Sequence, residues 1–292
     1  MSWAAHEFEN YFLQHKVGTR ASFLALAVGT QAPDLFTKYF VYKSDNPAAF
    51  HRGWPGIGFT HSLIFGVVLA GVVLAVARSR AWALGILIGQ WAHVATDIAD
   101  TAGVMPFFPF STEPVTIGMW KHAAVLGRYG DAAAYYSSLG FAWDAAWLTI
   151  TVVFARATLR SDYFRRVIVP ADPRPWSWLS RRFHLGERHL LLLYRGLFFY
   201  GVGRLTAWFL YARLDVRTPF QPIWGGPTYI GPGNDLSDAG VLEVLVRTTV
   251  GGVLFAAFGW GAWCTLGRRL WRRAGEPRYE EPDVRTLQGA TK

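Results

Sequence analysis

The stretches HSLIFGVVLAGVVLAV (residues 61–76) and ALGILIGQWAHVATDIAD (residues 83–100) decide the fold of this chain. Both are long apolar runs, and each carries a histidine near one end, His61 and His93. Because only the link Arg78-Ser79-Arg80 stands between the helices they predict, the two histidines should lie at the same end of a helical hairpin. Ionisable side chains at the edge of a membrane-spanning helix are costly to place there, so they indicate a functional site.

The composition predicts an integral membrane protein. Of the 292 residues 52% are hydrophobic and only 17% are charged, and the apolar residues gather in blocks of membrane-spanning length. These blocks are 21–40, 62–78, 81–99, 139–156, 189–212 and 241–266. We therefore expect an all-α, polytopic helical bundle of about six apolar segments. Residues 3–15 predict a short amphipathic N-terminal helix, with Trp3, Phe8, Phe12 and Leu13 among polar neighbours.

The order of the blocks indicates two membrane parts and a tail. Residues 1–138 carry the histidines and form the expected metal-site domain, and residues 139–275 add further membrane helices around a basic cytoplasmic loop. Residues 276–292 are rich in charge and in turn-forming residues, which predicts disorder. Cys264 is the single cysteine, which excludes an internal disulfide and a cysteine-rich metal site.

The positive charge is distributed as in a membrane protein. The net charge of +9 arises from arginines in residues 156–195 and directly after the last apolar block. Basic residues that flank spans mark the cytoplasmic side, and this explanation is favoured over a nucleic-acid partner. With the link 78–80 on that side, His61 and His93 face the opposite, extracytoplasmic side.

Histidines and carboxylates from four segments are expected to converge on that side. His93 and Asp97 share one helix face at i and i+4, and Asp100 follows on that face. Pro33 should break or end the first apolar helix, with Asp34 beside the break. A turn at residues 17–19 would fold the N-terminal helix back. The expected cluster is His6, Asp34, His61, His93 and Asp97.

These residue types suit a divalent metal. Imidazole nitrogens and carboxylate oxygens bind zinc, manganese or iron, and zinc is favoured. Five or six candidate ligands are more than one tetrahedral ion needs, so one or two ions are expected. Asp100 is a candidate further ligand, orienting group or general base.

Several motifs, in matching order, resemble the YdjM-like membrane-bound metal-dependent hydrolases over about residues 1–115. The motifs are His6, Pro33-Asp34, His51-Arg52-Gly53, Gly58-Phe59-Thr60-His61-Ser62-Leu63, the G-x-x-x-H-x-x-x-D helix Gly89–Asp97, Asp100–Val104 and Pro109-Phe110-Ser111. Residues 54–58 interrupt the histidine signature, and Asp34 lacks the family's D-I-D-H continuation. The resemblance implies a helical membrane protein with a divalent-metal hydrolase site, in which His51 is a further ligand.

The predicted function is hydrolysis of a lipid-linked or amphipathic phosphoester, because a site at headgroup depth meets phosphates first. The expected location is a bacterial-type plasma (inner) membrane, with membrane lipids as partners. Asp100 would act as base and Arg52 would neutralise substrate charge. Arg204, which has Tyr200 and Trp208 on its helix face, would hold a lipid phosphate or extend to the membrane interface.

The alternative is a non-enzymatic membrane protein, either a metal-ion carrier or a metal-free scaffold whose polar cluster is structural. A carrier needs polar groups through the bilayer, whereas residues 67–76 and 84–88 are almost wholly apolar. The metal-free scaffold is the stronger form of this alternative.

Overall fold

The computed structural model describes residues 5–43, 58–99, 103–119 and 139–211, together with Leu214 and scattered positions between 242 and 269. Apart from one isolated bridge between Val104 and Val115, the regular structure of these residues is helical, which confirms the all-α class. Five of the six predicted apolar blocks correspond to the helices α2 (Phe23–Lys43), α3 (Leu63–Ala77), α4 (Arg80–Asp97), α6 (Gly140–Thr158) and α10 (Glu187–Leu210). The sixth block, 241–266, and the tail lie largely or wholly outside the described residues.

Shorter helices precede, connect or follow the long ones. They are α1 (His6–Val17), η1 (Gly18–Arg20), η3 (Gly58–His61), α7 (Ser161–Tyr163), η5 (Phe164–Ile168), α8 (Val169–Ala171), α9 (Pro173–Phe183) and η7 (Trp263–Gly267). Across the part of the chain that the structure describes, none of the helices combines the length and the apolar character that a membrane crossing requires.

Helices α2 and α4 approach each other unusually closely through glycines. A Cβ atom on Gly89 would lie 2.5 Å from the carbonyl oxygen of Leu26 and 3.1 Å from the Cα of Gly29. A Cβ atom on Gly29 would meet the carbonyl oxygen of Ile86 at 2.6 Å. Because backbone lies on backbone at this crossing, neither position has room for a side chain. The crossing packs the middle of α4 against the N-terminal half of α2.

Pro33 does not end the first apolar helix, so that prediction was wrong. Helix α2 continues through Pro33 to Lys43. Proline removes only the one backbone hydrogen bond that its missing N–H would have made to Gly29. The packing of α2 against α4 outweighs that loss, and Asp34 consequently lies within the helix.

Local capping explains the hairpin of α3 and α4. The Ser62 hydroxyl accepts a hydrogen bond from the Phe65 N–H at the start of α3, and the Ser79 hydroxyl does the same for Trp82 in α4. Arg78 closes α3 in the left-handed conformation, with φ of 52°. The tight link that the sequence predicted therefore forms, and η3 and the end of α4 lie at the same end of the hairpin.

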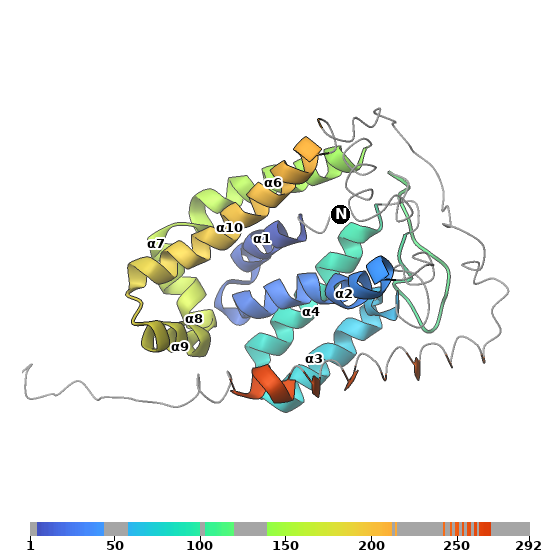
Figure 1. Ribbon diagram of the computed structural model, residues 1–292, viewed down its shortest axis with the longest axis horizontal. Helices are drawn as coiled ribbons and strands as arrows, with labels where there is room; N and C mark the ends of the chain where they lie inside the picture. Colours follow the sequence, from blue (N-terminus) through green and yellow to red (C-terminus); the bar gives the residue numbers. More distant parts are fainter. Residues whose placement is uncertain are drawn as a thin grey trace, which may run out of the picture.

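Helix α1 folds back at Gly18, which has a positive φ of 58° that favours glycine, and packs between two pairs of helices. Figure 1 shows α1 with α6 and α10 on one side and α2 and α4 on the other. The Tyr11 hydroxyl donates to the carbonyl oxygen of Tyr194 in α10 at 2.9 Å. On the opposite side, the Thr30 hydroxyl of α2 donates to the side chain of Asn10 at 3.0 Å. The predicted fold-back of this helix is confirmed.

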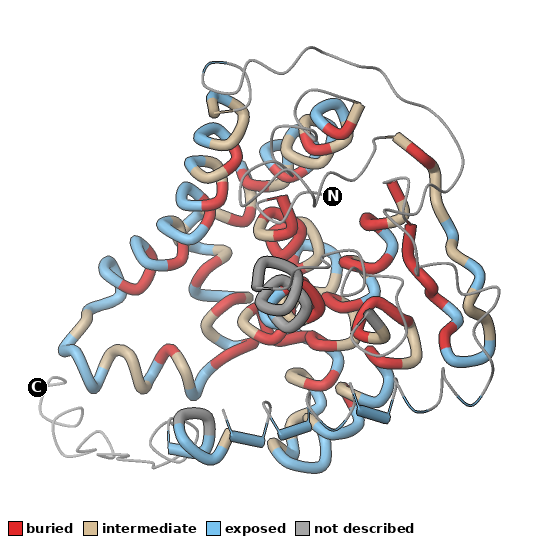
Figure 2. The backbone as a smooth tube through the Cα atoms, turned by 45° about the vertical axis from the view of Figure 1, so that its right-hand side comes forward, coloured by how far each residue is buried: buried red, intermediate tan, exposed pale blue. Residues whose placement is uncertain are grey.

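The segment predicted as a basic loop folds into short helices packed on the aromatic core. Asp172 accepts hydrogen bonds from the Ser22 hydroxyl and from the Leu24 N–H, so it holds the start of α2. Trp176 is buried against Phe164, and this burial fixes α9. Figure 2 shows the buried positions gathered in the middle of the molecule, with exposed positions on the outer sides of the helices.

Candidate metal centre

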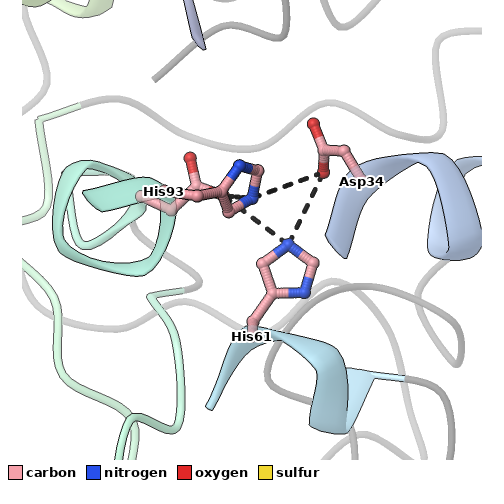
Figure 3. Close-up of side chains that lie close together, drawn as sticks. Asp34, His61 and His93 are labelled. Atoms are coloured by element: carbon pink, nitrogen blue, oxygen red, sulfur yellow. Dashed lines mark ion pairs between the residues drawn. The ribbon is translucent and has the colours of Figure 1, made fainter. Parts of the chain in front are cut away.

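Four of the predicted side chains converge in the interior. Asp34 comes from α2, His61 from the end of η3, and His93 and Asp97 from successive turns of α4. Figure 3 shows the Asp34, His61 and His93 side chains pointing toward one another from these three elements. One ligand atom from each of the four residues lies within 4.8 Å of the others, and all four residues are buried.

The carboxylates of this four-residue group stand between its two imidazoles. His93 Nε2 is 3.2 Å from Asp97 Oδ2 and 4.0 Å from Asp34 Oδ1. His61 Nε2 is 3.5 Å from Asp34 Oδ1 and 3.7 Å from Asp97 Oδ2. Each carboxylate therefore faces both imidazoles through one oxygen.

A backbone carbonyl sets the orientation of His93. Its Nδ1 lies 2.7 Å from the carbonyl oxygen of Thr30. Because a carbonyl oxygen can only accept, Nδ1 must carry the proton. In the neutral ring this leaves a lone pair on Nε2, which has no hydrogen-bond partner within the described parts of the chain. The carbonyl of α2 thus aims a free ring nitrogen at the two carboxylates.

His61 likewise has a buried ring nitrogen without a hydrogen-bond partner among the described residues. Its Nδ1 lies 3.3 Å from the Thr60 hydroxyl, and its buried Nε2 has no hydrogen-bond partner in the described ranges. Burial lowers the pKa of His61 to about 4, although the carboxylates of Asp34 and Asp97 oppose the shift. The ring is therefore neutral at pH 7.

This donor set fits one divalent ion. Buried polar atoms without a hydrogen-bond partner are uncommon and call for an explanation. Two imidazole nitrogens and two carboxylates are a ligand set that zinc, manganese and iron accept in proteins. The two negative charges also balance the charge of a divalent cation.

His6, predicted as a further ligand, lies directly behind the four-residue group. Its ring stacks on the His93 ring, with 3.9 Å between centroids, and its Nε2 is 3.2 Å from Asp97 Oδ1. Its Nδ1 is 3.3 Å from Glu9 Oε1. Burial alone would lower the pKa of His6, but the carboxylates of Glu9 and Asp97 outweigh that effect and raise it to about 9.

Gln90 has a role at the site that none of the sequence motifs predicts. This fully buried residue of α4 donates from Nε2 to the carbonyl oxygens of Thr60 and Ser62, at 3.0 and 2.9 Å. It therefore ties the segment that carries His61 to the helix that carries His93 and Asp97. The available signal was an amide side chain in the middle of the apolar run GILIGQWA.

Arg204 contacts residues of α1 and of its own helix. Its guanidinium forms an ion pair with Glu7 and lies over the rings of Tyr200 and Trp208, at 5.6 and 5.2 Å from their centroids. The expected grouping of Arg204 with the two aromatic residues is confirmed. The positive charge of Arg204 is paired with the carboxylate of Glu7. The predicted residues His51, Arg52 and Asp100 lie outside the described residues.

An all-helical fold with a buried group of two histidines and two aspartates defines a helical protein with a candidate metal centre. The chain belongs to the family described as YdjM inner membrane protein, whose model matches residues 4–163. This match confirms the predicted family and extends past residue 138, where the sequence placed a domain boundary. No curated protein and no solved structure shows significant similarity to the chain.

Proposed function

We propose that this protein is a membrane-bound, metal-dependent hydrolase whose Asp34, His61, His93 and Asp97 hold a divalent ion. One observation carries the proposal. The buried Nε2 atoms of His61 and His93 have no hydrogen-bond partner among the described residues, and they face two carboxylates. One ligand atom from each of the four residues lies within 4.8 Å of the others, so a single ion could contact all four. Zinc is the favoured ion for this ligand set, ahead of manganese and iron.

The residues of the chain prepare the site for that ion. The Thr30 carbonyl holds the His93 ring in the tautomer that offers Nε2, and burial keeps His61 neutral. Gln90 holds the two ligand-bearing segments together. A divalent ion bound there supplies Lewis acidity and lowers the pKa of a water molecule toward neutrality.

The substrate class that we propose is a lipid-linked or amphipathic phosphoester, met at the extracytoplasmic side of the inner membrane. The family is described as an inner membrane protein. Helix α3 exposes the apolar side chains Val67, Val68, Val72, Leu74 and Val76, as expected of a surface in contact with lipid. The proposal also includes roles for four further residues. Asp100 would act as base and Arg52 would neutralise the substrate charge. His51 would add a metal ligand, and Arg204 would bind a lipid phosphate.

A second candidate is a non-catalytic protein in which the ion is structural. The observation that favours it is the burial of all four residues of the group. Structural metal sites are closed by protein ligands, whereas catalytic sites keep one position open for water or substrate. Activity assays, rather than metal content, separate the two candidates.

The first experiment is elemental analysis of the detergent-purified wild type and of His93→Ala/Asp97→Ala. We expect about one ion per chain in the wild type and loss of that ion in the variant. The matched control is His189→Ala/Asp162→Ala, which removes the same residue types at exposed positions and should keep the metal. A wild type that binds neither zinc nor manganese after their addition would sink the proposal.

The second experiment assays the metal-loaded protein against phospholipids and lipid phosphates in mixed micelles. Phosphate release by the wild type that disappears in His93→Ala/Asp97→Ala, and not in the control, would support a hydrolase. Bound metal without turnover of any phosphoester in the panel would favour the structural ion.

A further inference from the structure

Asp97 uses its two carboxylate oxygens in different directions. Oδ2 faces the Nε2 atoms of His61 and His93, at 3.7 and 3.2 Å. Oδ1 lies on the other side, 3.2 Å from His6 Nε2. The direction of Oδ2 therefore depends on what holds Oδ1.

A buried carboxylate of α1 holds His6 in turn. Glu9 is 2% exposed, and its Oε1 lies 3.3 Å from His6 Nδ1. The same oxygen accepts a hydrogen bond of 2.7 Å from the Thr96 hydroxyl, which is adjacent to Asp97 on α4. Contacts thus run from α4 to α1 and back to α4, through Asp97, His6, Glu9 and Thr96.

The burial of Glu9 does not stabilise the fold in the way that burial of an apolar side chain would, so it calls for another explanation. Removing a carboxylate from water is costly unless partners compensate for the lost hydration, and here His6 and Thr96 both contact Oε1, while the buried Oε2 has no hydrogen-bond partner among the described residues. In metal sites, residues behind the ligands orient them, and replacing such a residue typically weakens metal binding 10- to 100-fold.

We propose that Glu9 and His6 are positioning residues that hold Asp97 so that its Oδ2 faces the ion. This inference rests on the metal centre of the proposed function. It gives His6 a role through Asp97 in place of the direct ligation that the sequence predicted. Glu9 acts one step further back, by fixing the His6 ring between two carboxylates.

The test uses the full-length, detergent-purified protein titrated with Co²⁺, whose visible absorption reports the geometry of its ligands. The variant Glu9→Gln keeps the size of the side chain and removes its charge. We expect a changed cobalt spectrum and about tenfold weaker binding. The matched control is Glu7→Gln, on the same helix but paired with Arg204, which should keep the wild-type spectrum and affinity.

A double-mutant cycle distinguishes action through His6 from a general loosening of α1. If Glu9 acts through His6, Glu9→Gln weakens binding in the wild type and has little further effect in His6→Ala. Additive effects would overturn the proposal. So would a His6→Ala variant that loses as much cobalt as His93→Ala, because His6 would then be a ligand.

Thr96→Val serves if Glu9→Gln does not fold, since it removes the hydroxyl donor to Glu9 at almost constant volume. A smaller spectral change in the same direction is expected, and an unchanged spectrum would contradict the inference.

Failure of the metal centre can be distinguished from failure of this inference. A wild type without cobalt or zinc ends the metal centre and this inference together. Normal cobalt binding by Glu9→Gln ends this inference alone.

Discussion

Helix α1 meets two different interiors. Toward α2 and α4 its buried side chains are polar, as in His6, Glu9 and Asn10, and we call this region the polar half. Toward α10 they are aromatic, where Phe8 and Tyr11 pack on Phe198, and we call this region, with α6 and α9, the aromatic half.

The two halves differ in what their burial achieves. Aromatic burial is favourable in itself and stabilises the fold. Buried histidines and carboxylates stabilise little after their loss of hydration, so their gathering at one point is better explained by a ligand. One helix thus connects a site to the core that supports it. Metal binding and stability should therefore respond separately to changes in the two halves.

The largest effect is expected where α2 crosses α4. Gly89→Ala would place a Cβ 2.5 Å from the Leu26 carbonyl oxygen, so the helices must separate. We expect a loss of about 3 kcal/mol of unfolding free energy and weaker metal binding. The control Gly71→Ala, with nothing within 4 Å, should be neutral or stabilising by up to about 1 kcal/mol. Equal stability of the two variants in denaturant unfolding would contradict the close crossing.

Metal removal should destabilise the protein through the polar half. With free zinc at about one hundred times Kd, bound metal adds about 2.7 kcal/mol, which a chelator withdraws. The measurement is the Tm with zinc and with chelator. His93→Ala/Asp97→Ala should show no such difference. A chelator shift that persists in this variant would place the ion elsewhere.

Gln90→Leu tests the connection within the polar half. It leaves the carbonyl oxygens of Thr60 and Ser62 without their donor, at a cost of about 1–2 kcal/mol. Because His61 loses its tie to α4, zinc affinity should fall about tenfold. The control Trp91→Phe removes a neighbouring bond to the Leu63 carbonyl from an exposed side chain, and zinc titration should find its affinity unchanged.

The smallest effect is expected in the aromatic half. Tyr11→Phe removes the hydrogen bond from the Tyr11 hydroxyl to the Tyr194 carbonyl oxygen and should cost about 1 kcal/mol. Zinc affinity should stay at the wild-type value, because the lost contact faces away from Asp97. Parallel unfolding and zinc titrations check this prediction. A tenfold weaker affinity would show that the halves are coupled through α1.

Much of the site could be predicted from sequence because its residues stand in recognisable patterns. His93 and Asp97 lie one helical turn apart, and the caps at Ser62 and Ser79 set the hairpin that brings His61 to the same end. Pro33 misled the prediction, because the cost of one missing hydrogen bond was weighed without the packing against α4.

The contacts behind the ligands were harder to predict. The Thr30 carbonyl that orients His93 has no side-chain signature, since every residue carries one. Glu9 resembles any acidic residue in the first turns of a helix, where the helix dipole favours negative charge. Only the fold places it against His6 and Thr96. The glycine crossing is visible as Gly85 and Gly89 one turn apart, but its partner Gly29 emerges only from the packing.

The burial of the four-residue group also affects how long a bound ion would stay in the site. Asp34, the most exposed of the four, is only 3% exposed, and the His6 ring covers one face of His93. If the proposed ion binds here, its release requires local opening of the described elements around the four residues, which include α1, α2, η3 and α4. We therefore expect the frequency of that opening, together with the strength of the metal–ligand bonds, to set the residence time of the ion. Exchange of labelled zinc should accordingly follow hydrogen exchange of the α1 amides.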